Sequence, residues 1–125
     1  MWLSIFAIFF GAGFGALLRA GFNLLAAGTA SMVPLGTLLA NLLGGYLIGI
    51  AIAFFGNNPN LSPEWKLFVI TGFLGGLTTF SSFSAEVITL MQRGELTWAL
   101  GTALLHLIGS LTLTFLGILT YQALK

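Results

Sequence analysis

Long stretches of the sequence carry no charge, and this feature constrains the fold more than any other. The 125 residues contain only four basic and three acidic side chains. Residues 2–18, 35–55, 67–85 and 96–124 contain none of them. Each stretch is apolar and close to the ~20 residues that an α-helix needs to cross the hydrocarbon core of a bilayer. The sequence therefore predicts an all-α membrane protein with four transmembrane helices.

The segments between these stretches collect the residues that end helices. Clusters of Pro, Asn, Ser and Gly separate the first three helices, and a charged turn precedes the fourth. A cleavable signal peptide is the competing interpretation of residues 1–30, but no basic segment precedes the apolar run and Arg19 interrupts its far end. Without a repeat or low-complexity segment, residues 1–125 form a single unit. We expect helices at about 2–27, 35–56, 66–92 with a break near 75–79, and 97–124.

Composition excludes several classes of function. Only 6% of the residues are charged and 58% are hydrophobic, whereas roughly 25% are charged in a soluble domain. The net charge is +1 without a basic run, which excludes nucleic-acid binding. The absence of cysteine removes disulfides and thiolate metal sites. No nucleophile–base or carboxylate pair is visible, so we expect no enzyme.

The basic residues give no preferred orientation in the membrane. With four spans, Lys66 and Lys125 lie on one side, while Arg19 and Arg93 lie on the other. Orientation normally follows an excess of Lys and Arg in cytoplasmic loops, and here two oppose two. Copies are thus expected to insert in both directions and to pair as an antiparallel, dual-topology homodimer.

Polar residues recur at helical spacing within the expected spans. In the fourth helix, Thr102, His106, Ser110 and Thr114 follow one another at intervals of four and form one polar stripe. Such residues mark an ion pathway, or else bond their own helix backbone and aid packing. His106 has no acidic neighbour at helical spacing, which favours a pore-lining or core role over metal binding.

Asn41 in the second helix shares a face with Gly45 and Gly49. A small-residue packing seam explains the two glycines, but it does not explain a carboxamide in the middle of a membrane span. Asn41 is therefore a candidate binding residue.

The third helix carries the strongest local signal, the glycine- and hydroxyl-rich segment 72–84. Gly75–Gly76 is easily unwound, and three of the residues after it are good N-caps for a new helix. Carbonyls freed by such a break suit a cation, while the N-terminus of the second half-helix attracts anions. The candidate N-caps are Thr78, Thr79 and Ser81.

Phe80 and Phe83 share a face of that second half-helix. Ordinary packing is one interpretation, and contact between an anion and the positive ring edges is the other. Arg19 either draws anions into a vestibule or extends its side chain to the lipid headgroups. Glu86, one turn past Phe83, is awkward for an anion path, and its role stays open.

The chain resembles the Fluc fluoride channels, also called CrcB proteins, along essentially its whole length. The resemblance rests on Arg19, on Gly-Thr-Leu-Leu-Ala-Asn-Leu-Leu-Gly at 36–44, on Gly-Gly-Leu-Thr-Thr-Phe-Ser-Ser-Phe-Ser-Ala-Glu at 75–86, and on Gly-Ser at 109–110. It implies a dual-topology homodimer in the bacterial inner membrane that exports fluoride passively through two antiparallel pores. It also implies a structural sodium ion on the dimer axis, held by the backbone carbonyls of Gly75 and Thr78. The residues expected along the fluoride path are Asn41, Thr79, Phe80, Ser81, Phe83, His106, Ser110 and Thr114, with Arg19 near its mouth.

Two other classes are weighed against this one. A small proton-coupled drug-efflux transporter is also a four-helix, dual-topology dimer, but it needs a carboxylate deep in the membrane, and the first expected helix, residues 2–27, contains none. A structural membrane subunit without transport is the third candidate, and the polar stripe argues against it.

Overall fold

The computed structural model describes all residues, 1–125, and every regular element in it is a helix. Three helices are continuous: α1 (Trp2–Ala26), α2 (Leu35–Gly56) and α6 (Leu96–Leu124). The third span consists of α3 (Pro63–Lys66), the π-helical segment η1 (Leu67–Leu74), α4 (Gly75–Leu77) and α5 (Phe80–Gln92). All four spans are long and apolar enough to cross a membrane. The prediction of an all-α chain with four such helices is confirmed.

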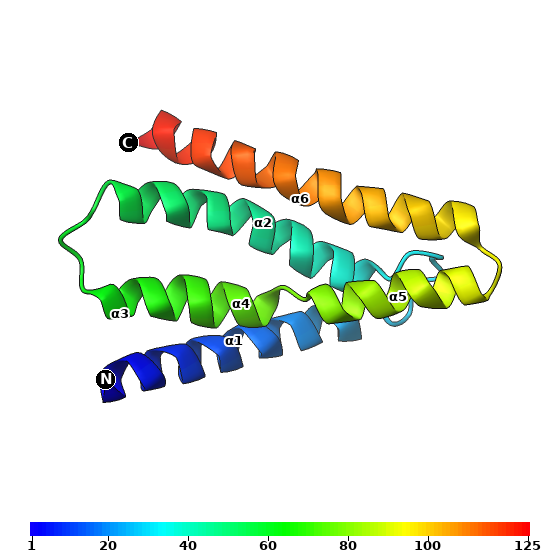
Figure 1. Ribbon diagram of the computed structural model, residues 1–125, viewed down its shortest axis with the longest axis horizontal. Coiled ribbons are helices and arrows are strands. Elements are labelled where there is room, and N and C mark those ends of the chain that lie inside the picture. Colours follow the sequence, from blue (N-terminus) through cyan, green and yellow to red (C-terminus); the bar gives the residue numbers. More distant parts are fainter.

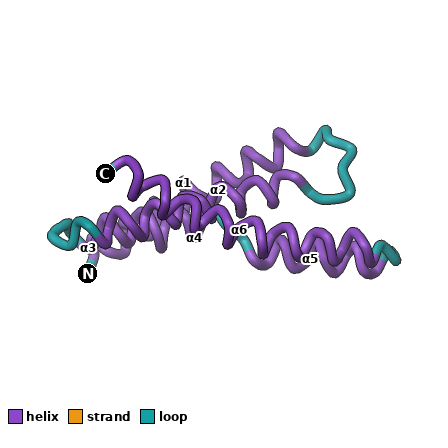
Figure 2. The backbone as a smooth tube through the Cα atoms, turned by 90° about the horizontal axis from the view of Figure 1, so that it is seen from above, coloured by secondary structure: helices purple, strands orange, loops and turns teal.

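The four spans alternate in direction along the longest axis of the molecule. Both termini and the α2–α3 loop lie at one end, and the α1–α2 and α5–α6 loops lie at the other (Figure 1). α2 packs mainly along α6, and α1 packs along η1 and α4. Viewed from above, the α1–α2 and α5–α6 ends diverge from one another (Figure 2). The chain is thus two packed pairs of helices that share the centre of the molecule.

Few side chains are buried within the chain itself. Only 18 of 125 residues are buried, and large apolar side chains such as Phe9, Leu24 and Phe80 face outward. An apolar surface of this extent would cause aggregation in water, whereas a bilayer or another protein surface covers it without that penalty. The fold therefore depends on an apolar environment.

Glycines allow the helices to approach closely at two seams. On α1, a side chain at Gly15 would collide with the backbone carbonyl of Phe73 in η1. At the second seam, a side chain at Gly49 on α2 would collide with the carbonyl of Thr114 on α6. The small-residue interpretation of Gly49 is therefore right, because backbone-to-backbone packing of this kind drives helix association in membranes.

The third span differs from the sequence-based expectation in where its helix stops. Gly75 and Gly76 are helical, so the expectation that they unwind is wrong. Gly76 instead packs against the backbone of Ala12 in α1. The residues that leave the helix are Thr78 and Thr79, both with extended backbone. Tertiary packing against α1, which local sequence does not reveal, keeps the glycines helical.

The glycine seam generates a stability prediction. Gly49→Ala should lower the free energy of unfolding by about 1–3 kcal/mol, since the new methyl group forces α2 away from α6. Gly101→Ala on the open side of α6 is the matched control, because no atom lies within 4 Å of the added methyl group. It should have no destabilising effect, since alanine favours helix. Thermal unfolding in detergent measures both, and equal melting temperatures would contradict the seam.

Candidate functional site

Asn41 holds the interruption of the third span. Its Oδ1 accepts a hydrogen bond from the Thr79 amide at 2.8 Å, and its Nδ2 donates to the Thr79 carbonyl at 3.1 Å. In an unbroken α-helix the Thr79 amide would bond the carbonyl of Gly75. The Asn41 carboxamide thus takes the place of helix hydrogen bonds and keeps Thr79 extended.

The same contacts determine which ring nitrogen of His106 carries the hydrogen. Because the Thr79 amide can only donate, Oδ1 of Asn41 must face it, and Nδ2 is left to face Nδ1 of His106 at 3.0 Å. Nδ1 must then accept, which places the imidazole hydrogen on Nε2. His106 is 4% exposed, and its Nε2 is buried without a partner. The ring therefore carries one buried, unused donor.

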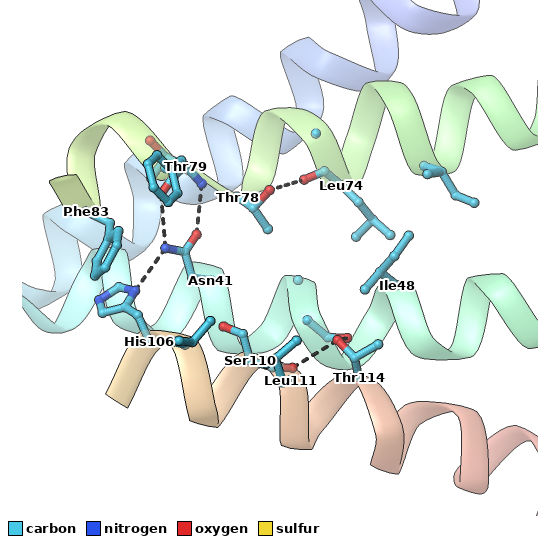
Figure 3. Close-up of a pocket in the computed structure, with 16 residues that line it drawn as sticks. Asn41, Ile48, Leu74, Thr78, Thr79, Phe83, His106, Ser110, Leu111 and Thr114 are labelled. Carbon is cyan, nitrogen blue, oxygen red and sulfur yellow. Dashed lines mark hydrogen bonds between the residues drawn. The ribbon is translucent and has the colours of Figure 1, made fainter. Parts of the chain in front are cut away.

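A cavity of about 490 Å³ opens beside Asn41, between α2, the third span and α6 (Figure 3). No charged residue lines it. Part of the polar stripe of α6 and part of the glycine face of α2 meet there: His106, Ser110 and Thr114 lie opposite Asn41 and Gly45. Among the expected site residues, the structure brings together Asn41, Gly75, Thr78, Thr79, Phe80, Phe83, His106, Ser110 and Thr114.

Two hydroxyl groups on α6 differ in what they can offer a ligand. Oγ1 of Thr114 donates to the backbone carbonyls of Gly45 at 2.8 Å and Ser110 at 2.9 Å, so its hydrogen is engaged. The Ser110 hydroxyl lines the cavity and is half-buried, without the backbone bonds that engage Thr114. Ser110 is therefore the more available donor.

The phenylalanine pair forms an aromatic wall with His106. The rings of Phe80 and Phe83 meet edge to face, with centroids 5.6 Å apart, and Phe83 packs on the His106 ring at 4.5 Å. Phe80 is 79% exposed and points out of the single chain. Ring edges are electropositive, so this wall can contact an anion without a formal positive charge.

Thr79 also begins the second half of the third span. Its Oγ1 accepts from the Ser82 amide at 3.1 Å, which makes Thr79 the N-cap of α5. The first amides of a helix have no partner within it, and the helix dipole adds positive potential there. Ser81 is exposed, and its hydroxyl lies 3.3 Å from that of Thr79. Ser81 is not among the residues that line the cavity of the single chain, and its place on a fluoride path stays a prediction.

Arg19 reaches the interruption from α1. Its Nε donates to the carbonyl of Gly76 at 3.2 Å. Arg19 does not line the cavity, so its side chain supports the broken backbone from the opposite side. This contact spans 57 residues of sequence and has no local signal.

The carbonyls proposed as cation ligands lie at the interruption. The Gly75 carbonyl lacks its usual helix partner, because the Thr79 amide donates to Asn41 instead. The Thr78 carbonyl accepts no hydrogen bond. The chain has no cluster of His, Cys, Asp or Glu that could hold a metal. Neutral backbone oxygens are suitable ligands for a monovalent hard cation, so these residues fit sodium.

Three polar residues, two buried and one half-buried, belong to the surroundings of the site without lining the cavity. Thr37 Oγ1 donates to Oε2 of Glu86 at 2.6 Å, while Oε1 of Glu86 is buried without a partner. Thr102, one turn from His106, is fully buried and its hydroxyl also lacks a partner. Sequence reasoning placed Thr102 on the polar stripe, but it did not predict the pairing of Thr37 with Glu86 across two helices.

An uncharged cavity with a few hydrogen-bonding groups, set among helices that can span a membrane, is typical of channels and transporters. Comparison with known sequences narrows this class. Residues 6–118 match the family described as CrcB-like protein, camphor resistance. The chain belongs to this CrcB family.

Three curated relatives share the name fluoride-specific ion channel FluC. The relative from Polynucleobacter asymbioticus is 79% identical, and the match covers all of both chains. The relative from Tolumonas auensis is 60% identical over all of this chain and 98% of its own. The relative from Burkholderia mallei is 59% identical, and the match covers 98% of this chain and 96% of its own. These relatives are ion channels, and the expectation that the chain is not an enzyme is confirmed.

The Asn41 bridge generates the prediction for this site. Asn41→Ala leaves the amide and carbonyl of Thr79 without partners, which should cost about 1–3 kcal/mol of unfolding free energy. Ser110→Ala, on the opposite wall of the same cavity, is the matched control and should change stability little. Melting temperatures of the two variants in detergent test this difference. A melting temperature of Asn41→Ala equal to that of the control would show that Asn41 does not hold the interruption.

Proposed function

We propose that the chain forms a fluoride-selective channel that exports fluoride passively and lowers its cytoplasmic level. The observation that carries this proposal is the cavity, which offers hydroxyl, imidazole and ring-edge contacts and no fixed charge. The names of relatives that match the chain over nearly its full length support it. We place the channel in the bacterial inner membrane as a multi-pass protein.

Fluoride is small and strongly hydrated, so a pore must replace most of its water. Conduction requires binding that is favourable enough for entry and weak enough for exit. Ser110 and the first amides of α5 are uncharged donors, and Phe80 and Phe83 add ring edges. A lysine or arginine in the cavity would hold the anion too tightly. The uncharged lining is thus suited to rapid passage.

Asn41 and Thr114 differ from the free donors, because their hydrogens are already used in hydrogen bonds within the chain. Both amide hydrogens of Asn41 are donated within the chain, and so is the hydroxyl hydrogen of Thr114. Either side chain contacts fluoride only by exchanging one of these bonds. An exchange of this kind costs little when the new bond replaces the old one, and it prevents the ion from being trapped. The Arg19 charge, held behind the interruption, adds a positive potential without lining the path.

A second copy of the chain completes the channel. The outward position of Phe80 and the extensive apolar surface support a partner, and the balanced basic residues support an antiparallel one. In this homodimer the interruptions of the two third spans meet near the middle of the bilayer. The Gly75 and Thr78 carbonyls would hold a structural sodium ion there, and a bound cation would stabilise the free carbonyls and add positive charge near both pores.

The dimer and its cation are tested together by crystallography. Crystals soaked with a heavier monovalent cation in place of sodium should show anomalous density between two antiparallel copies, coordinated by backbone oxygens of Gly75 and Thr78. Density coordinated by side chains, or a parallel pair of chains, would contradict this assembly.

Proton-coupled drug efflux is the alternative to fluoride conduction, and a flux experiment distinguishes the two. α1 has no acidic residue to exchange protons. Purified protein in liposomes should release fluoride in the absence of a proton gradient, as followed with a fluoride electrode. Proton-driven uptake of an organic cation would favour the antiporter, and no flux of either kind would favour a structural subunit.

Phe83→Ile tests the ring edge within that assay. Isoleucine keeps an apolar side chain but removes the electropositive edge, so fluoride efflux should fall by between about twofold and tenfold. Phe80→Ile should act in the same direction. Phe54→Ile at the far end of α2 is the control, because Phe54 packs on Tyr121 and does not line the cavity. If both variants conduct like this control, the phenylalanines are packing residues only.

A further inference from the structure

A second cavity lies at the end of the molecule that carries the α2–α3 loop. Its volume is about 430 Å³, and it is formed by the last turns of α2, the loop and the first turns of the third span. Asn58, Ser62 and Lys66 provide its polar groups, while Ile52, Phe55 and Ile70 provide apolar walls. None of these residues belongs to the site described above except Ile70, which lines both cavities.

The two cavities follow one another along the same pair of helices. On α2, Ile48 lines the inner cavity and Ile52, one turn later, lines the outer one. On the third span, Ile70 is common to both cavities and Lys66 lies about one turn further out. Figure 3 shows the inner cavity reaching Ile48 and Leu74 at the side away from His106. The two cavities are thus neighbours along these helices, and three isoleucines, Ile48, Ile52 and Ile70, lie between them; we call these residues the isoleucine collar.

Lys66 is the only charged residue that lines either cavity. Its side chain is exposed. Glu64 lies two residues earlier, and residues at this spacing point to different sides of a helix. The Glu64 carboxylate accepts the hydroxyl of Ser62, a lining residue of the outer cavity, so its charge lies near this cavity and partly opposes the field of Lys66. The other lysine at this end of the molecule, Lys125, donates to Asn57 at 3.3 Å and lines neither cavity.

We propose that the outer cavity is the mouth of the ion pathway at the α2–α3 end, and that Lys66 sets the rate at which anions enter it. This inference rests on the proposed anion conduction. A fixed charge in a recess with apolar walls raises the local concentration of counter-ions, because low-dielectric walls focus its field. At the rim, outside the isoleucine collar, the ammonium attracts an anion without holding it in the narrow part of the path. The charge that is absent from the inner cavity is therefore useful at the entrance.

The expected size of the effect follows from Coulomb's law. A unit charge about 8 Å from an anion in water raises its local concentration about two- to threefold without screening, and about 1.4-fold at a screening length of about 8 Å. At physiological ionic strength charges separated by more than about 8 Å are largely screened, so more distant lysines contribute little. Near 1 M salt the screening length falls to about 3 Å, and the contribution of Lys66 should be lost.

The test uses the absence of cysteine from the chain. Lys66→Cys introduces a single thiol, which is labelled in detergent with methanethiosulfonates that attach a cationic, neutral or anionic group of similar size. The labelled proteins are reconstituted in liposomes, and fluoride efflux is measured below saturation at about 0.15 M potassium isethionate. Flux should decrease from the cationic to the neutral to the anionic adduct, by about 1.4-fold at each step and about twofold in total, with the cationic adduct close to the parent. Near 1 M salt the three should converge.

Lys125→Cys with the same labels is the matched control, and its flux should not depend on the sign of the label. Equal flux for the three Lys66→Cys adducts, or an order that persists unchanged at high salt, would overturn the proposal. If the parent protein conducts fluoride but the sign of the label has no effect, only the proposal that Lys66 marks the mouth is rejected. Parent protein that conducts no fluoride rejects the proposed function itself.

Discussion

The bidentate contact between Asn41 and Thr79 is the interaction on which the site depends. A membrane offers no water to backbone groups that leave a helix, so an interrupted span is stable only where protein groups replace the lost hydrogen bonds. Asn41 supplies both an acceptor and a donor to Thr79, and Arg19 supports the Gly76 carbonyl from the other side. α5 can then begin inside the protein, with its N-terminal amides and Phe80 beside the cavity.

The second constraint is the absence of charge from the cavity. An uncharged, hydrogen-bonding lining can compensate a small anion only if many weak contacts act together, and most of these groups are also bonded to each other. His106 shows the consequence, since its Nδ1 is engaged by Asn41 while its Nε2 hydrogen stays free. Selectivity and speed then both depend on how easily these internal bonds are exchanged for bonds to the ion.

Much of this arrangement could be predicted from the sequence because helical periodicity is strong in apolar spans. The interval of four between His106, Ser110 and Thr114 placed them on one face, and the structure puts that face on the cavity. Contacts between helices could not be predicted in the same way. The bond from Arg19 to Gly76 joins residues 57 positions apart, and the helical state of Gly76 depends on its packing against α1. Local sequence describes which residues share a face, but not which neighbouring helix that face meets.

The central claim is that uncharged contacts in this cavity select fluoride, and a reversal potential tests it most directly. Purified protein in a planar bilayer would face a tenfold gradient of fluoride, with chloride and pH equal on both sides. The account predicts a current that reverses at about 59 mV, the equilibrium potential of a monovalent ion across a tenfold gradient. A reversal potential well below this value, which shows that chloride or another ion shares the current, would contradict it.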